Sequence, residues 1–169
     1  CSEKFVFGEL VDQILLTAKA TAEKKEQSLI NETGSRIVLE TDRQMLLSVV
    51  ANLVQNAIKY SRNGGKITVH AKVMGDSLEF KVADECGGIK PVILKNLFSP
   101  FVSGEKNKGG LGLGLTIVER AVSLLQGKVS IENQPGTGCV FVVKIPRTLS
   151  GGRKKLVSGS DSVQPRRKK

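Results

Sequence analysis

Residues 41–61, TDRQMLLSVVANLVQNAIKYS, decide the fold of this chain. Apolar residues recur in this stretch at intervals of three and four, which predicts an amphipathic helix packed on a core. Thr41 and Gln44 have the spacing of a capping box, so we expect the helix to begin at Thr41. The predicted core face consists of Leu46, Val49, Val50, Leu53, Ala57 and Ile58.

The polar face of the same helix is built mainly from uncharged amides. At about 100° per residue, its side chains fall within roughly a quarter of the helix circumference. Such a stripe is more often ordinary solvated surface, which is usually charged. Amides ending in one lysine suit a bound phosphate and a hard cation better, if the following stretches support that interpretation. The face consists of Ser48, Asn52, Gln55, Asn56 and Lys59.

Two alternating stretches after this helix predict a β-hairpin that turns at Gly75 and Asp76. The alternation places His70 on the polar face, so we give this histidine no catalytic role. The inward positions are Ile67, Val69, Ala71 and Val73 on the first strand, and Leu78, Phe80 and Val82 on the second.

Asp84 continues the inward parity at the end of the second strand, ahead of Gly87 and Gly88. An inward carboxylate is costly unless a donor satisfies it. Either it caps the following turn, or it accepts the exocyclic amino group of an adenine and repels guanine, which offers a carbonyl there. The glycines would let a base approach the backbone closely.

Residues 110–118, GLGLGLTIV, place glycines at alternate positions before a helix that we expect to run to Gln126 and to end at Gly127. Consecutive N–H groups at a helix N-terminus can face an anion, which the helix dipole also favours. The polar residues 103–110 before it are expected to be mobile. This glycine pattern alone is a weak signal.

The remaining segments predict further helices and strands. We expect a helix over residues 9–26, with Leu10, Ile14, Leu15 and Ala18 buried. Residues 29–31 and 36–40 resemble strands, and 90–97 form a short helix or an irregular link. Strands over 128–132 and 138–145 close the domain.

Composition restricts the function classes. The 169 residues suffice for one domain, and most of the net charge of +10 lies in residues 147–169, which hold eight basic residues and one acidic residue. One histidine excludes a histidine-rich metal centre, and three scattered cysteines indicate a reducing compartment. No apolar run approaches the roughly 20 residues that span a bilayer, so we expect a soluble, cytoplasmic piece of a parent protein that could be membrane-anchored.

Taken in order, these segments resemble the ATP-binding catalytic domain of sensor histidine kinases, in the wider family that includes gyrase and MutL. The resemblance covers about residues 3–146. It implies an α/β fold, the two-layer α/β sandwich (Bergerat fold) with a mixed sheet and helices packed on one face. It also implies a catalytic domain over 1–148 and a basic, disordered tail over 149–169. The matching motifs are residues 52–61 (NLVQNAIKYS), 84–89 (DECGGI), 98–101 (FSPF), 110–115 (GLGLGL) and 136–138 (GTG).

The resemblance also implies roles by position. Asn56 would ligate Mg²⁺, Asn52 and Lys59 would contact phosphates or metal-bound water, and Asp84 would bind adenine. Phe98 and Phe101 would anchor a lid in which either Lys106 or Lys108 reaches the γ-phosphate. The other expected ATP-binding residues are Tyr60, Gly88, Ile89, Gly110, Leu111, Gly112, Leu113, Gly114, Leu115 and Thr137.

One difference from ATP-hydrolysing relatives, at Asn52, and departures from the family pattern at Cys86 and Cys139 bear on the reaction. Relatives that hydrolyse ATP carry a glutamate at the position of Asn52, and an amide cannot accept a proton from water at neutral pH. The site therefore suits phosphate delivery to an outside nucleophile. Cys86 replaces the first glycine of its motif and would be strained by roughly 1–3 kcal/mol if that position needs a positive φ. Cys139 stands where Ser or Thr is common.

We therefore expect a histidine kinase domain that uses ATP and Mg²⁺. Its partners would be a histidine-bearing dimerisation hairpin, absent from this chain, in a parent homodimer, and a response regulator. The alternative is a non-catalytic module of the same fold that binds ATP or ADP, motivated by Cys86 and by the lid over residues 102–109, which is short and lacks the aromatic–arginine pair often found in the family. The basic tail could bind nucleic acid through phosphates, but no aromatic residue interleaves with its charges, so we expect no specific nucleic-acid partner.

Overall fold

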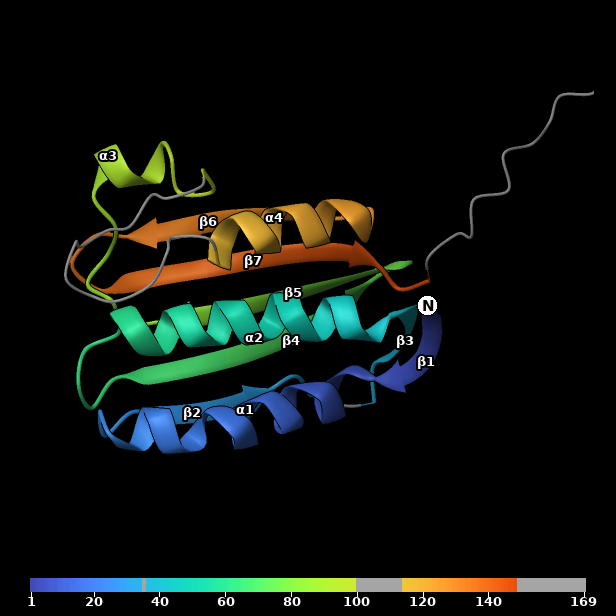
Figure 1. Cartoon of the computed structure of the whole chain (residues 1–169), viewed down its shortest axis with the longest axis horizontal. Helices are drawn as coiled ribbons and strands as arrows, with labels where there is room; N and C mark the ends of the chain where they lie inside the picture. The colour runs from blue at the N-terminus through green and yellow to red at the C-terminus, as the bar shows by residue number, and fades with distance from the viewer. Residues whose placement is uncertain (35, 100–113, 149–169) are drawn as a thin grey trace, which may run out of the picture.

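The computed structural model describes residues 1–34, 36–99 and 114–148. Three helices, α1 (Phe7–Glu23), α2 (Arg43–Tyr60) and α4 (Gly114–Leu124), lie side by side on one face of a five-stranded sheet (Figure 1). The strand order of this sheet is β2-β4-β5-β7-β6. The expected two-layer α/β sandwich with helices on one face is therefore confirmed. The strands are β2 (Ser28–Glu32), β4 (Lys66–Met74), β5 (Ser77–Asp84), β6 (Lys128–Gln134) and β7 (Gly138–Pro146).

The sheet is mixed, because β2 runs parallel to β4 while the other neighbouring strands pair antiparallel. A second sheet joins β1 (Ser2–Val6) to β3 (Val38–Asp42). Hence β2 and β3, which lie on either side of the turn near Gly34, belong to different sheets. Their closeness in sequence did not predict this. A short helix, α3 (Pro91–Leu94), precedes the residues that the structure leaves undescribed.

The core lies between the helices and the large sheet. The predicted apolar face of α2 is fully buried, and so are the inward positions of β5. Phe7 at the start of α1 and Phe80 on β5 meet with ring centroids 5.2 Å apart. Val73 has the predicted parity but is 44% exposed, because it lies at the hairpin end of β4, next to Met74 and the turn. His70 is exposed, as its position predicted.

Several helix boundaries differ from the sequence expectation. Asp42, not Thr41, caps α2: its carboxylate accepts the Met45 N–H at 2.9 Å, while Thr41 is buried in β3. Helix α1 spans Phe7–Glu23 rather than residues 9–26. Helix α4 ends at Leu124, and the left-handed residue after it is Gln126, with φ 59°. Gly127 is needed instead for close packing, since a Cβ there would lie 2.5 Å from the Lys144 carbonyl oxygen.

Within the described residues, the structure has no helix long and apolar enough to span a membrane.

Candidate functional site

The amide face of α2 meets the first residue of α4. A Cβ on Gly114 would lie 3.2 Å from Asn52 Oδ1 and 3.7 Å from Asn56 Nδ2. Asn52 donates its own Nδ2 to the Ser48 carbonyl oxygen at 2.8 Å, so its side-chain oxygen is left as an acceptor on the Gly114 side. The absence of a side chain at Gly114 thus leaves space beside two amide groups at a helix N-terminus.

The carboxyl end of α2 is held by two side chains from the α1–β2 connection. The Lys25 ammonium donates to the carbonyl oxygens of Ile58, Lys59 and Ser61 at 2.6, 3.1 and 2.8 Å. The buried Gln27 amide donates to Ile58, Ser61 and Arg62 at 3.1–3.2 Å. Because the last carbonyls of a helix lack intrahelical partners, these donors set where the helix stops and where Tyr60 lies.

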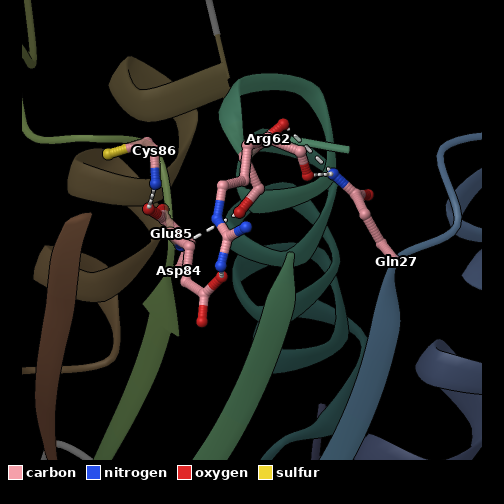
Figure 2. A network of polar contacts seen from close by, with 6 residues as sticks. Gln27, Arg62, Asp84, Glu85 and Cys86 are labelled. Atoms are coloured by element: carbon pink, nitrogen blue, oxygen red, sulfur yellow. Dashed lines mark hydrogen bonds and ion pairs between the residues drawn. The ribbon is translucent and has the colours of Figure 1, made fainter. Parts of the chain in front are cut away.

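The same helix end is joined to the end of β5. The Arg62 guanidinium pairs with the Glu85 carboxylate at 2.7 Å, and the Ser61 hydroxyl oxygen accepts the Glu85 N–H at 2.9 Å. Figure 2 shows Arg62 between the Gln27 amide on one side and the Asp84–Cys86 segment on the other. The amide-bearing helix and the acidic strand end are therefore fixed relative to each other.

Asp84 caps the turn that follows β5, which is one of the two roles that the sequence suggested for its carboxylate. Its Oδ1 accepts the N–H of Cys86 at 3.0 Å (Figure 2) and that of Cys139 at 3.4 Å. Gly138 lets β7 approach this point, since a Cβ there would overlap the Asp84 carbonyl oxygen. Oδ2 contacts the Cys139 Sγ at 3.3 Å and has no backbone donor among the described residues. The capping role therefore leaves one carboxylate oxygen for a ligand.

The loop after Asp84 is shaped by two glycines and one asparagine. Gly87 and Gly88 adopt φ values of 80° and 92°, in the left-handed region that disfavours other residues. Gly88 also lies against the Pro135 turn, where a Cβ would come within 2.9 Å of Pro135 Cα. Asn133 holds Ile89 at both backbone groups, at 2.8 and 2.9 Å. This bidentate contact fixes the loop on β6.

Cys86 needs no strained backbone. Among the described residues, the non-glycine positions with positive φ are Glu26 and Gln126, so cysteine is tolerated at the first glycine position of the motif. Burial raises the pKa of the Cys86 thiol, and the neighbouring Asp84 raises it further. Burial, followed by the charge of Asp84, raises the pKa of the Cys139 thiol far more. Both thiols are therefore protonated at neutral pH.

A pocket of about 400 Å³ opens beside this loop. Two expected ATP-binding residues, Tyr60 and Thr137, line it. Asn52, Asn56, Lys59 and Asp84 do not line it, so this pocket adjoins the amide face without containing it. The Lys59 ammonium lies 5.1 Å from the Tyr60 ring centroid, which is a cation–π distance. The other lining residues are Lys25, Ser61, Arg62, Asn63, Glu85, Cys86, Gly87 and Gly136.

Phe98 packs against the core, and its carbonyl oxygen accepts the Thr116 hydroxyl at 3.0 Å, which ties this motif to α4. Leu115 also packs on the core. The remaining expected positions lie outside the described residues: Phe101, Lys106, Lys108, Gly110, Leu111, Gly112 and Leu113.

Sequence reasoning missed several residues that shape the site. Asn133 lies on the same, inward side of β6 as Val129 and Ile131. A polar residue at an inward position near a strand end was the signal that selected Asp84, and the same signal could have identified Asn133. Lys25 and Gln27 gave no comparable signal, because their acceptors lie more than 30 residues away.

The fold and the site together define a class, the α/β nucleotide-binding domains with amide, acidic and glycine motifs around one helix. A family model described as histidine kinase-, DNA gyrase B-, and HSP90-like ATPase matches residues 41–149. The chain therefore belongs to this ATPase family, and solved structures that resemble it include histidine kinase catalytic domains.

The chain is similar to curated sensor proteins, including sensor histidine kinases. The chain is 34% identical over 125 residues to the alginate biosynthesis sensor protein KinB of Pseudomonas aeruginosa, covering 73% of this chain and 21% of KinB. It is 30% identical over 144 residues to the sensor-like histidine kinase SenX3 of Mycobacterium tuberculosis, covering 83% of this chain and 35% of SenX3. The chain thus spans a minor part of the length of these relatives.

Among solved structures, the nucleotide-free catalytic domain of histidine kinase ThkA superposes with a TM-score of 0.79 at 29% identity. The match covers 88% of this chain and 97% of that one. ThkA in complex with its response regulator TrrA matches with a TM-score of 0.71 at 28% identity, over 87% of this chain and 42% of that one. These neighbours are consistent with a histidine kinase ATPase domain.

Proposed function

We propose that this chain is the catalytic ATP-binding domain of a two-component sensor histidine kinase, which transfers the γ-phosphate of ATP to a histidine on a separate dimerisation hairpin. The observation that supports this most directly is the meeting of Asn52 and Asn56 with Gly114. It brings two amide groups to the N-terminus of α4, where backbone N–H groups favour an anion. Phosphates bound there would lie between α2 and α4.

The residues present fit Mg²⁺, which prefers oxygen ligands and keeps several waters. Asn56 would hold the ion. The Asn52 oxygen lies on the Gly114 side because the Asn52 Nδ2 donates to Ser48, and this oxygen would hold a metal-bound water or a phosphate. When bound, the Mg²⁺ ion would neutralise part of the negative charge on the phosphates. Lys59, at the end of the same face, adds a positive charge toward the phosphates.

Asp84 would select adenine. Oδ1 is engaged by the Cys86 and Cys139 N–H groups, so the carboxylate is held in place while Oδ2 accepts the exocyclic amino group. Tyr60, Gly88, Ile89 and Thr137 would border the nucleotide around it.

Phosphotransfer is favoured over hydrolysis because Asn52 offers no base to activate water. The chain's residues would position ATP and balance its charge, and the nucleophile would come from the hairpin. We propose that the parent is a homodimer that acts in the cytoplasm with a response regulator. The free thiols of Cys1, Cys86 and Cys139 fit a reducing compartment.

Isothermal titration of the full chain with ATP, ADP and GTP, with and without Mg²⁺, tests the nucleotide site. Asn56→Ala should weaken Mg-ATP binding about 10- to 100-fold, the equivalent of one or two charge-assisted contacts. Gln44→Ala is the matched control, because Gln44 is an exposed amide on the same helix outside this face. Equal affinities for the two variants would contradict the assignment of Asn56.

Transfer is tested by mixing the chain with Mg-ATP and a histidine-bearing hairpin and measuring acid-labile phosphate on the hairpin. Full ATP binding without any transfer, across hairpins from several related kinases, would contradict the kinase function and favour the nucleotide-binding module. Asn52→Glu should add slow ATP hydrolysis, since it restores a base beside the phosphates.

A further inference from the structure

Three side chains around the end of β5 form a cluster that the proposed ATP chemistry does not use as a unit. The ligand atoms of Asp84, Cys86 and Cys139 all lie within 4.8 Å of one another. Cys86 Sγ lies 3.4 Å from Cys139 Sγ, and Cys139 Sγ lies 3.3 and 3.5 Å from the two Asp84 carboxylate oxygens. The two cysteines are 53 residues apart and meet through the β5–β7 pairing.

The two separations from Cys139 Sγ nearly match the edges of a tetrahedral zinc site, and the Cys86 sulfur and the Asp84 carboxylate lie within 4.8 Å of each other. With Zn–S of about 2.3 Å and Zn–O of about 2.1 Å, tetrahedral angles place two sulfurs about 3.8 Å apart and a sulfur and an oxygen about 3.6 Å apart. The distances between Cys139 Sγ and both Cys86 Sγ and Asp84 Oδ2 are each within about 0.4 Å of these edges. A disulfide would instead need the sulfurs to approach to about 2.05 Å.

The chemical types of the three side chains also favour a zinc site. Zinc is a borderline-soft cation, and both cysteine thiolates and aspartate carboxylates are among the ligands that it takes in proteins. The surrounding contacts orient the carboxylate, because Oδ1 is fixed by two backbone N–H groups while Oδ2 faces the Cys139 sulfur. A bound dication would deprotonate the thiols that otherwise stay protonated here.

An ion can reach the cluster from the Cys86 side. Cys139 is 2% exposed, whereas Cys86 is half-buried and belongs to the lining of the 400 Å³ pocket. Figure 2 shows the Cys86 sulfur directed away from the Arg62–Glu85 pair, so that ion pair does not block it.

We propose that Asp84, Cys86 and Cys139 bind Zn²⁺, and that zinc and adenine exclude each other because both need the Asp84 carboxylate. The competition rests on the proposed adenine role of Asp84, whereas the metal site itself does not. Zinc would then act as an inhibitor of ATP binding at this domain.

Cobalt(II) is the probe for the metal site. The reduced full chain should bind one Co²⁺ with thiolate-to-cobalt charge-transfer absorbance, which Zn²⁺ abolishes by displacement. Cys139→Ser and Cys86→Gly should each lose this absorbance. Cys1→Ser is the matched control and should keep it, since Cys1 is exposed at the N-terminus. Absence of the absorbance in the reduced wild-type chain overturns the site, whatever its affinity for ATP.

ATP titration tests the competition. Free Zn²⁺ at ten times its Kd should weaken ATP binding to the wild-type chain about 11-fold, as for any exclusive competitor. Cys139→Ser should bind ATP in the absence of zinc and show no such weakening, which corrects for chelation of zinc by ATP itself. Equal zinc effects on both proteins overturn the competition. Failure of the metal-free wild-type chain to bind ATP would instead contradict the proposed function.

Discussion

The substitution Gly138→Ala tests whether the close approach of β7 to Asp84 is needed for the candidate site. A Cβ at Gly138 would overlap the Asp84 carbonyl oxygen and lie 2.9 Å from the Asp84 carbonyl carbon. To relieve this overlap, β7 and β5 would have to separate by on the order of 1 Å, against a normal strand spacing of about 4.8 Å. Such a shift would affect the end of both strands, where Asp84 lies.

The cost can be worked from the contacts at this point. Overpacking costs about 1–3 kcal/mol. The separation would also weaken the bonds from the Cys139 N–H to Asp84 and from the Gly87 N–H to the Thr137 carbonyl, each worth about 1 kcal/mol. We therefore expect Gly138→Ala to lower the free energy of unfolding by about 2–4 kcal/mol.

Gly136→Ala, in the turn just before β7, is the matched control. Gly136 has a φ of 82°, but a Cβ added there would have no neighbouring atom within 4 Å, so only backbone strain of about 1–2 kcal/mol is expected. Urea unfolding followed by linear extrapolation gives both free energies, and ATP titration gives the effect on the site. If Gly138→Ala is no more destabilising than Gly136→Ala, the close approach of β7 to Asp84 is refuted.

Three further predictions concern residues around the site. Gln27→Leu should lower the unfolding free energy by about 1–3 kcal/mol, because three carbonyl groups at the end of α2 lose a buried donor; an unchanged urea midpoint would contradict this. The N-terminal ammonium and the Met45 N–H lower the pKa of Asp42 in the folded chain. The charged Asp42 carboxylate therefore stabilises the fold above its unfolded pKa of about 3.9, and this stabilisation is lost as the pH falls through the lowered folded pKa. The stability advantage of the wild-type chain over Asp42→Asn should therefore shrink in acid, and parallel pH curves would refute it. Asn133→Ala should accelerate hydrogen exchange at the Ile89 amide and leave that of Val50 in α2 unchanged, whereas protection of Ile89 in the variant would show that other contacts hold the loop.

Short-range periodicity was enough to predict the layers of the fold. The spacing of Leu46, Val49 and Leu53 and the alternation of Leu78, Phe80 and Val82 report directly which side of each element is buried, and the structure confirms both. The cap of α2 was mispredicted because Thr41 and Asp42 are adjacent and both are good capping residues. Pairing of β3 with β1 turns Thr41 inward, and this pairing is not visible in the local pattern.

The sequence by itself determined the order of motifs and the identity of the groups that could bind a nucleotide, since those depend on residue type and spacing along one element. Only the tertiary structure decided that Gly138 packs on Asp84, that Arg62 pairs with Glu85 and that Cys86 meets Cys139. The physical reason is that these contacts join different elements, 53 residues apart for Cys86 and Cys139, across strand pairings and a helix end. Their geometry follows from how the helices and the sheet pack, and no local propensity encodes it.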